Sequence, residues 1–214
     1  MNKNPSISSQ PVVYVVDDDQ AVRESLVWLI ESVGLKVESF PSAQVFLNHY
    51  QNNTPGCLLL DVRMPGLSGL ELQDHLRERG MPLPIIFITG HGDVPMAVKA
   101  MKHGAVDFIE KPFNDQRLLD TLQKAIRDNL LTWEQKQESV NLIARWNDLS
   151  NREREVLDLV VLGKVNKQIA DILQISIKTV EGHRASVMRK MNARTVADLV
   201  RMVLEIREMR ESSS

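Results

Sequence analysis

Short apolar runs and amphipathic stretches alternate along the first 125 residues of the chain. Four runs are almost continuously apolar and rich in β-branched or aromatic side chains: Val12–Val16, Cys57–Leu60, Ile85–Ile88 and Val106–Ile109. Such runs predict strands that are buried on both faces, as in a parallel sheet. A fifth run, Lys36–Phe40, alternates in polarity, which predicts a strand at the edge of the sheet.

Patterns with helical spacing separate these strands, at about 20–33, 42–50, 68–79 and 93–103, and a further pattern begins near Asn114. Five repeats of strand and helix favour a doubly wound α/β domain. Five strands within about 115 residues fit the flavodoxin-like order 2-1-3-4-5. We therefore predict a five-stranded parallel sheet with helices on both faces.

The last of these helix patterns continues beyond the point where the domain should end. Its apolar side chains are spaced by three and four residues, with Asn129 and Lys136 as polar members of the series: Leu119, Leu122, Ile126, Trp133, Val140 and Ile143. No glycine or proline occurs between Asn114 and Leu162. We predict a long helix over about 115–146 that links two domains and can pair with its copy as a coiled coil. The alternative is a helix that closes the domain, followed by a frayed linker.

Residues 149–204 show four short helical patterns and no strand pattern. The predicted helices lie at about 151–162, 166–173, 177–191 and 195–206. Ser150 and Glu153 form a capping box at the start of the first helix, and Gly163 ends it. Gln174-Ile175-Ser176 forms a tight turn before the third helix. The second half is therefore a small all-α domain.

Composition places the chain among ordinary globular proteins. Of its 214 residues, 43% are hydrophobic, which argues against extensive disorder. No run of about 18 apolar residues is present, so we expect no membrane span. The first ten residues lack the apolar core of a signal peptide, so we expect a cytoplasmic protein. The single cysteine, Cys57, lies in an apolar run, which predicts a buried and unreactive thiol.

The net charge of −2 hides an uneven distribution. Residues 1–130 carry 12 Lys/Arg and 16 Asp/Glu, a net charge of −4, whereas residues 131–214 carry 14 and 12, a net charge of +2. Within 164–194, seven basic residues face only two acidic ones, a net charge of +5. A concentrated basic segment attached to an acidic domain indicates a polyanionic partner for the second half alone.

Residues suited to phosphoryl chemistry stand where the predicted strands end. The first strand ends in Asp17-Asp18-Asp19, the third in Asp61, the fourth in Thr89 and the fifth in Glu110-Lys111-Pro112. In a doubly wound sheet, ligands bind beyond the carboxyl ends of the strands, where the strand order reverses. Clustered carboxylates protonate unless a cation neutralises them, and oxygen ligands of this kind suit Mg²⁺. Mg²⁺ together with Lys111 can stabilise a phosphoryl group on a nearby carboxylate.

Four segments resemble the receiver domain of response regulators: VVDDD at 15–19, LLLDVRMPGLSG at 58–69, ITGHGD at 88–93 and DFIEKPF at 107–113. The resemblance implies that Asp61 accepts the phosphoryl group. It implies a Mg²⁺ site formed by Asp18, Asp61 and the backbone carbonyl of Arg63, with Asp17 acting mainly through water and orientation. It also implies that Thr89 and Lys111 bind the phosphoryl oxygens.

The same resemblance assigns three further features. Asp19 is expected outside the ligand set, as a helix N-cap. The Lys111-Pro112 peptide is expected to be cis, which aims the lysine inward. Phe108 stands where the family has a tyrosine or phenylalanine whose ring turns inward on activation. Since phenylalanine has no hydroxyl group, its switch would rest on packing alone.

The segment 166–191 has the pattern of a helix-turn-helix. The side chains spaced to pack inward are Ile169, Ala170, Leu173, Ile175, Val180, Val187 and Met188. The polar side chains left outside on the second helix are Lys178, Thr179, Glu181, His183, Arg184, Arg189 and Lys190. Basic side chains near both ends of this helix can reach phosphates on either side of a major groove, which is about 12 Å wide.

The stretch LSNREREVLDLVVLGKVNKQIADILQISIKTVEGHRASVMRKM resembles the LuxR/FixJ/NarL-type output domain, and the receiver segment 89–113 resembles the FixJ-like branch. The resemblance implies DNA anchoring by Lys178, Thr179, His183, Arg184 and Lys190, with Asn166 and Lys167 as further phosphate contacts. Gly182, on the base-facing side, replaces a larger residue usual in the family. Glycine costs about 1 kcal/mol of helix propensity relative to alanine, and the change leaves Glu181 as the best direct reader, accepting from cytosine N4.

Together these features predict a transcription factor switched by phosphorylation. We expect a disordered tail at 1–10, a receiver domain at 11–128, a helical linker at 129–147 that is a possible coiled coil, a LuxR-type DNA-binding domain at 148–208 and a disordered tail at 209–214. The expected partners are a sensor histidine kinase, double-stranded promoter DNA and RNA polymerase, with σ70-type activation as the expected output. One alternative is a phosphohydrolase with an aspartyl-phosphate intermediate, but Arg63 stands where such enzymes usually need a second carboxylate. Another is an RNA-binding or purely protein-binding output, and the lack of aromatic residues in the basic segment disfavours stacking of single-stranded bases.

A single recognition helix reads too few base pairs to find one site in a genome, so a two-fold dimer is expected. The helix at 93–103, the fifth strand and the start of the long helix form one face, which Thr89 and Phe108 flank. We expect a monomer that dimerises across this face when it is phosphorylated. The rival is a constitutive coiled-coil dimer formed through Trp133, Val140 and Ile143.

Overall fold

The computed structural model describes residues 10–51, 54–90 and 92–211, and the chain forms two compact units that meet between Glu134 and Gln135. The boundary lies inside the segment predicted as a linker, 129–147. Apart from Gln10, the predicted N-terminal tail falls outside the described residues. Across the described part of the chain, none of the helices combines the length and the apolarity that a membrane crossing requires.

The first unit contains a five-stranded parallel sheet, and the predicted fold class is confirmed. Its strands are β1 (Val12–Val16), β2 (Lys36–Phe40), β3 (Gly56–Asp61), β4 (Ile85–Thr89) and β5 (Asp107–Glu110). They lie in the order β2-β1-β3-β4-β5, and each neighbouring pair is parallel. The strand order reverses between β1 and β3, so the carboxyl ends of these two strands flank the predicted crevice.

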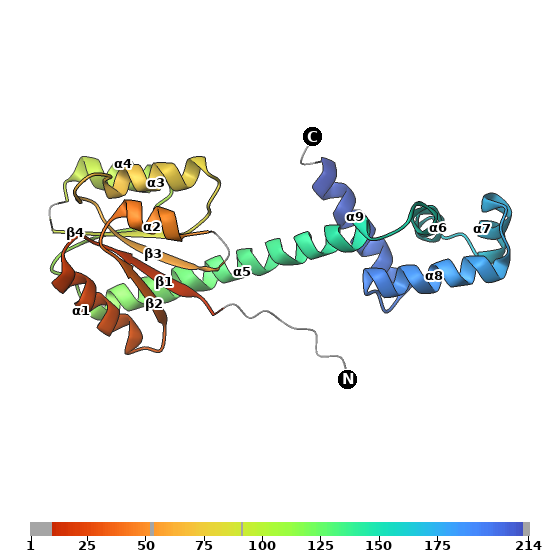
Figure 1. The fold of residues 1–214 in the computed structure, drawn as a ribbon, viewed down its shortest axis with the longest axis horizontal. Coiled ribbons are helices and arrows are strands. Elements are labelled where there is room, and N and C mark those ends of the chain that lie inside the picture. Colours follow the sequence, from red (N-terminus) through yellow and green to blue (C-terminus); the bar gives the residue numbers. More distant parts are fainter. Residues whose placement is uncertain (1–9, 52–53, 91, 212–214) are drawn as a thin grey trace. The chain divides into compact units, whose positions relative to one another are not determined.

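Helices cover both faces of this sheet, as Figure 1 shows. Their bounds are α1 (Gln20–Glu31), α2 (Ala43–His49), α3 (Gly69–Glu78), α4 (Val94–Lys102) and α5 (Asp115–Asn147). Alternate strand residues point to opposite faces, so each strand contributes to two cores. Val13 and Leu59 pack with α1 and α5, whereas Tyr14 and Leu60 pack with α2, α3 and α4. Cys57 is buried in the first of these cores, where burial raises the pKa of its thiol, as expected for an unreactive cysteine.

The long helix predicted from the apolar seam is present as α5, which continues without interruption from Asp115 to Asn147. Its first turns belong to the sheet core through Leu118, Leu122 and Ile126. Asn129 then fastens it to the amino ends of two strands, since its side chain accepts from the Gly56 N–H at 2.9 Å and donates to the Pro82 carbonyl at 3.1 Å. The frayed-linker alternative is therefore wrong.

The last turns of α5 belong to the second unit. Leu142 and Trp146 are buried there against α8 and α9, whereas Val140 and Ile143 of the predicted seam are exposed. Arg154 donates to the carbonyls of Trp146 and Asn147 at 3.4 and 3.2 Å, which satisfies acceptors at the end of the helix. Pairing of the exposed seam with another copy stays a prediction.

The second unit adds four helices among the described residues: α6 (Asn151–Val161), α7 (Asn166–Leu173), α8 (Ile177–Met191) and α9 (Val196–Glu211). The predicted capping box at Ser150 and Glu153 is present, and Gly163 follows α6 with a positive φ of 77°. Gln174 ends α7 in the left-handed region, which makes the tight turn into α8. The helix-turn-helix geometry predicted for 166–191 is confirmed.

Helix α9 is longer than predicted, so the expected tail is wrong for residues 209–211. Met209 packs against the core around Trp146, and the Arg210 guanidinium lies 5.4 Å from the centre of the Trp146 ring. These apolar and cation–π contacts stabilise an additional helical turn, so α9 continues to Glu211. Residues 212–214 fall outside the described residues.

The burial of Trp146 predicts that the end of α5 stabilises the second unit alone. Trp146→Ala should lower the free energy of unfolding of that unit by about 3–5 kcal/mol, because a buried aromatic side chain is lost. Val140→Ala, six residues earlier on the same helix and exposed, should change it by less than about 0.5 kcal/mol. Hydrogen exchange along a urea titration, resolved by peptide, separates the two units. Equal effects of the two substitutions would contradict this packing.

Candidate functional site

Three carboxylates converge at the carboxyl ends of β1 and β3. Oxygen atoms of Asp17, Asp18 and Asp61 lie within 4.8 Å of one another. Asp17 and Asp61 are buried, whereas Asp18 is exposed at the rim. The sheet topology creates this cluster, because the parallel strands β1 and β3 are adjacent and end at the same edge.

Asp17 is held by donors on every side. Its carboxylate accepts from the Asp19 N–H at 2.9 Å and from Lys111 Nζ at 2.7 Å, and its carbonyl accepts from the Arg23 guanidinium at 2.7 Å. Asp19 itself caps α1 by accepting from the Ala21 and Val22 N–H groups, as predicted. The carboxylate of Asp17 is therefore committed to protein donors, which agrees with an indirect role toward a metal ion.

Asp61 is the unusual acid of the cluster. It is 8% exposed, and burial raises its pKa from 3.8 to about 6. This value is a net result: the charges of Asp17 and Asp18 also raise the pKa, while the charge of Lys111 and a backbone hydrogen bond at Val62 lower it. A divalent cation beside these carboxylates would favour the ionised form, and the all-oxygen donor set fits Mg²⁺.

The remaining predicted pocket residues lie at or just after the carboxyl ends of β3, β4 and β5. Thr89 ends β4 with its side chain buried, and its carbonyl accepts from the Lys111 N–H at 2.8 Å. Lys111 is followed by a cis peptide bond to Pro112, as expected. Arg63 is exposed in the turn after β3, and the metal contact predicted for its carbonyl stays a prediction.

Phe108 is half-buried on β5, with its ring 6.1 Å from that of Phe87. A Cβ atom added at Gly92 would lie 2.7 Å from the Phe108 ring and 3.0 Å from Thr89 Cγ2. Because Gly92 has no side chain, the Phe108 ring can occupy the space beside Thr89. The ring and the Thr89 side chain thus share one packing site, as a switch that rests on packing requires.

In the second unit, α8 buries one face and presents the opposite face to solvent. Val180, Val187 and Met191 are buried. At about 100° per residue, the face opposite to them carries Lys178, Gly182, Ala185 and Arg189, all of which are exposed. Cations therefore stand at both ends of the outward face, and the smallest side chains stand between them, where a Cβ atom at Gly182 would meet no atom within 4 Å.

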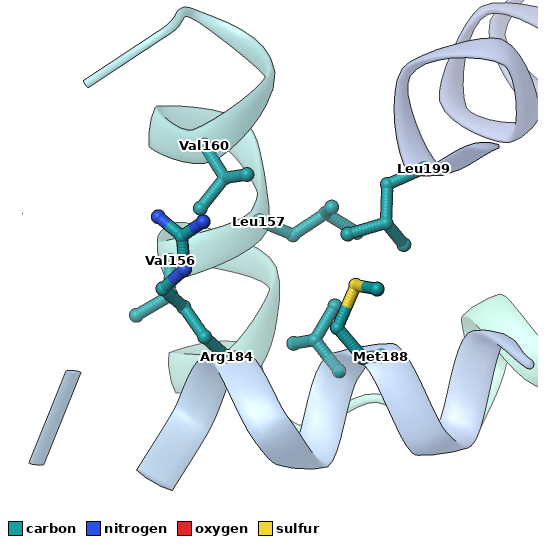
Figure 2. Close-up of a pocket in the computed structure, with 7 residues that line it drawn as sticks. Val156, Leu157, Val160, Arg184, Met188 and Leu199 are labelled. Carbon is teal, nitrogen blue, oxygen red and sulfur yellow. The ribbon is translucent and has the colours of Figure 1, made fainter. Parts of the chain in front are cut away.

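The other predicted DNA contacts lie in different environments. Lys167 and Glu181 are exposed, Asn166 and His183 are half-buried, and the Thr179 hydroxyl pairs with Ser176 Oγ at 2.7 Å. Arg184 does not lie on the outward face: Figure 2 shows it reaching from α8 along α6, beside Val156 and Val160. Lys190 is engaged inside the unit, 2.9 Å from Glu153 Oε2. DNA contacts by these residues stay predictions.

The space in Figure 2 between α6, α8 and α9 is a packing defect and not a ligand site. It has a volume of about 10 Å³ and is lined by Val156, Leu157, Val160, Arg184, Val187, Met188 and Leu199. A single water molecule needs about as much volume, together with polar partners. The apolar lining indicates that the space stays dry.

Four residues with roles at these sites were not identified from the sequence. Arg23 and Gly92 support the acidic cluster and the Phe108 ring, and Ser186 donates to Glu153 Oε1 at 2.6 Å. Of the four, Ala185 could have been identified from the sequence, because helical spacing places it on the same face as Lys178 and Gly182. The contacts of Ser186 and Gly92 join segments distant in the chain, and that of Arg23 depends on how its long side chain folds back to the Asp17 carbonyl.

Comparisons with known proteins divide the chain in the same way. Residues 13–123 match the family described as response regulator receiver domain, and residues 147–203 match the bacterial regulatory proteins of the luxR family. Response regulator protein TodT of Pseudomonas putida is 47% identical over 203 residues, which cover 94% of this chain and 88% of TodT. Transcriptional regulatory protein FixJ of Bradyrhizobium diazoefficiens is 45% identical over 192 residues, covering 90% of this chain and 94% of FixJ.

Solved structures agree with these sequence comparisons. The response regulator StyR superposes with a TM-score of 0.83 at 45% identity, covering 92% of this chain and 99% of StyR. Full-length FixJ from B. japonicum gives a TM-score of 0.55 at 44% identity, covering 93% of this chain and 98% of FixJ.

The raised pKa of Asp61 predicts that its charge destabilises the metal-free fold. Asp61→Asn should raise the free energy of unfolding of the first unit above pH 7, by on the order of 2 kcal/mol. Because the folded pKa of about 6 lies above the ordinary 3.8, the gain should shrink as the pH falls from 6 to 4 and vanish below that. Urea unfolding in EDTA measures it. Asp19→Asn, which keeps a good helix cap, is the matched control and should show no such pH profile. An Asp61→Asn protein no more stable than the wild type at pH 8 would contradict the raised pKa.

Proposed function

Because the chain belongs to the response regulators that join a receiver domain to a LuxR-type DNA-binding domain, we propose that Asp61 is its phosphoacceptor and that α8 is its recognition helix. The chain is a phosphorylation-dependent transcriptional regulator of a two-component system, with a sensor kinase and DNA as its partners. The convergence of Asp17, Asp18 and Asp61 beside Lys111 carries the assignment of the phosphoacceptor.

The geometry supports a simple transfer reaction. A carboxylate oxygen of Asp61 attacks the phosphorus of the donor phosphohistidine, the phosphorus–nitrogen bond breaks, and the imidazole leaves with the electron pair of that bond. Lys111 stands next to the cluster and is positioned to neutralise phosphoryl oxygens, and the buried Thr89 offers a hydroxyl at the same strand edge. Positioning and charge neutralisation are the main demands of phosphoryl transfer.

Mg²⁺ is the proposed cofactor. Asp18, Asp61 and the backbone carbonyl of Arg63 would hold it, and Asp17 would act through water because its own carboxylate oxygens already accept from Asp19 and Lys111. When bound, the ion would offset the repulsion among the carboxylates and the charge of the incoming phosphoryl group. Its presence would therefore favour the ionised, nucleophilic form of Asp61.

We further propose that the protein is not a turnover enzyme. A phosphohydrolase that works through an aspartyl phosphate usually carries an acid–base carboxylate two residues after the nucleophile. Here that position is Arg63, whose exposed guanidinium offers only hydrogen-bond donors and no carboxylate. The phosphorylated state can then persist long enough to act as a signal, with only slow loss of the phosphoryl group.

Asp61 should be the only residue that gains a phosphoryl group. Incubation with acetyl phosphate and Mg²⁺ should add one phosphoryl mass to the wild type and to Asp19→Asn, and none to Asp61→Asn. Intact-protein mass spectrometry measures the gain. The wild-type gain should disappear in EDTA, because the carboxylates then lack their cation. A phosphoryl adduct on Asp61→Asn would disprove the assignment, and an unchanged rate in EDTA would disprove the role of Mg²⁺.

The second unit is proposed to bind double-stranded promoter DNA and to recruit RNA polymerase as an activator. The outward face of α8 carries Lys178 and Arg189 with small side chains between them, which suits a helix lying in a groove between two phosphate backbones. Glu181 is exposed on the flank of this face and is the proposed reader of a cytosine N4 group. No aromatic residue is present between 164 and 194, which disfavours stacking with single-stranded RNA.

Phosphorylation is proposed to act through dimerisation. The α4 and β5 face of the first unit exposes a group of apolar side chains, Val94, Val98, Met101 and Val106. The Phe108 ring extends from β5 into the space beside Gly92, which lies just before α4. A change at Thr89 and Phe108 can therefore alter this face directly. Exposed apolar groups of this kind favour association with a second copy.

Beryllofluoride, an analogue of the bound phosphoryl group, should convert the wild type from monomer to dimer in sedimentation. Val98→Glu should prevent this conversion, because a charge would be buried in the contact. Val45→Glu on α2 is a matched control, since Val45 is 45% exposed and Val98 is 46% exposed, and it should dimerise normally. A protein that is dimeric with and without beryllofluoride would support the rival coiled coil of α5. A protein that is monomeric in both states would contradict both versions.

A further inference from the structure

Lys190 differs from Lys178 on the same helix because its ammonium group is engaged by two acceptors of the second unit. It donates to Glu153 Oε2 at 2.9 Å and to the Asp148 carbonyl at 3.0 Å. Asp148 directly follows α5, and Glu153 lies in the first turn of α6. One side chain of the recognition helix α8 therefore holds the junction between the linker helix and the DNA-binding helices.

Glu153 is the centre of this arrangement. It is 6% exposed, and its carboxylate accepts from Lys190, from the Ser186 hydroxyl at 2.6 Å and from the Ser150 N–H at 2.7 Å. Burial alone would raise the pKa of Glu153, but the hydrogen bonds from Ser186, Lys190 and Ser150 lower it to about 2. The group is therefore a buried carboxylate whose charge is satisfied almost entirely by α8 and by the cap of α6.

Helical geometry places this group on one flank of α8. Ser186 and Lys190 are four residues apart and lie at about 60° and 100° from Arg189, which stands at the centre of the outward face. Ser186 Oγ also accepts from the Arg189 guanidinium at 3.3 Å, so the group borders the outward face. Their side chains turn toward α6, where Glu153 is buried. Lys190 is thus not equivalent to Lys178, although the two residues look alike in the sequence.

We propose that Lys190, Glu153 and Ser186 form a clamp that sets the position of the recognition helix, and that Lys190 acts through Glu153 and Asp148 and not on a DNA phosphate. This proposal rests on the proposed DNA-binding function of α8. Contacts to bases need close placement of the helix, whereas contacts to phosphates carry no sequence information and tolerate small shifts. Loss of the clamp should therefore reduce discrimination between sequences more than it reduces general affinity for DNA.

The test compares Lys190→Met with Lys178→Met in the full chain, in the presence of beryllofluoride and Mg²⁺. Two probes are needed: a duplex selected by the wild type from a random library, and a duplex of alternating dI and dC. For Lys190→Met we expect at least tenfold weaker binding to the selected duplex, little change on the dI-dC duplex, and an unchanged salt dependence. For Lys178→Met we expect weaker binding to both probes and a salt slope reduced by about 0.9, since one phosphate contact is lost.

A mutant cycle and a conservative variant separate positioning from general destabilisation. Glu153→Gln combined with Lys190→Met should bind no more weakly than the weaker single variant, because both remove the same interaction. Lys190→Arg should retain the selectivity, since a guanidinium can donate to both Glu153 and Asp148. All measurements are made at a temperature at which circular dichroism shows each variant to be folded.

Each contrary result overturns the proposal in a recognisable way. A salt slope that falls by about 0.9 in Lys190→Met would make Lys190 a phosphate contact. An unchanged ratio of selected to non-selected binding in the folded variant would leave the clamp a purely structural feature. A wild type without any salt-dependent DNA binding would refute the proposed function itself. The clamp would then be judged by hydrogen exchange, where unchanged protection of 148–153 and α8 in Lys190→Met would refute it as well.

Discussion

Mutual repulsion of carboxylates at the ends of β1 and β3 is the constraint on which the first unit depends. Three acidic side chains stand within 4.8 Å of one another, and two of them are buried. Two features reduce this repulsion. Lys111 forms an ion pair with Asp17, and the pKa of Asp61 is raised to about 6, which favours its uncharged form. Carboxylates that repel one another in this way favour the binding of a divalent cation. The same cation and Lys111 can then stabilise the additional charge of a phosphoryl group on Asp61.

That site can affect distant parts of the chain only through elements that connect to it. Thr89 and Lys111 belong to the ends of β4 and β5, and the Phe108 ring fills the space left by Gly92 before α4. The packing of Phe108 against Gly92 and Thr89 therefore lies between the end of β4 and the start of α4. The proposed effect of Asp61 on the face of α4 and β5 would pass through this packing, because a packed core has discrete arrangements rather than continuous ones.

The two ends of helix α5 belong to different units of the chain. Leu122 and Asn129 tie its first half to the sheet, and Leu142 and Trp146 tie its last turns to the DNA-binding unit. Arg154 and the Lys190 clamp then bind the end of this helix and the junction after it. Helix α5 therefore begins in the core of the first unit and ends in the core of the second, and Val140 and Ile143 are among the exposed apolar positions near its end.

Much of this molecule follows from local pattern. Continuous apolar runs determine strands buried on both faces, capping residues such as Ser150 determine where helices begin, and the absence of glycine and proline allows α5 to continue. The strand ends that carry Asp17, Asp61, Thr89 and Lys111 were identifiable because the parallel topology brings such ends to one edge. The extension of α9 to Glu211 was not, because it depends on contacts with Trp146, a residue of another helix.

Tertiary structure alone decided which charged residues face outward and which are bound inside the protein. Lys178 and Lys190 are the same residue type on the same helix, and the sequence assigned both to DNA. The fold brings Glu153, 37 positions before Lys190, into contact with it and leaves Lys178 exposed. The pKa of Asp61 is decided in the same way. Charges interact through space and through the degree of burial, and neither quantity is present in the order of residues until the chain has folded.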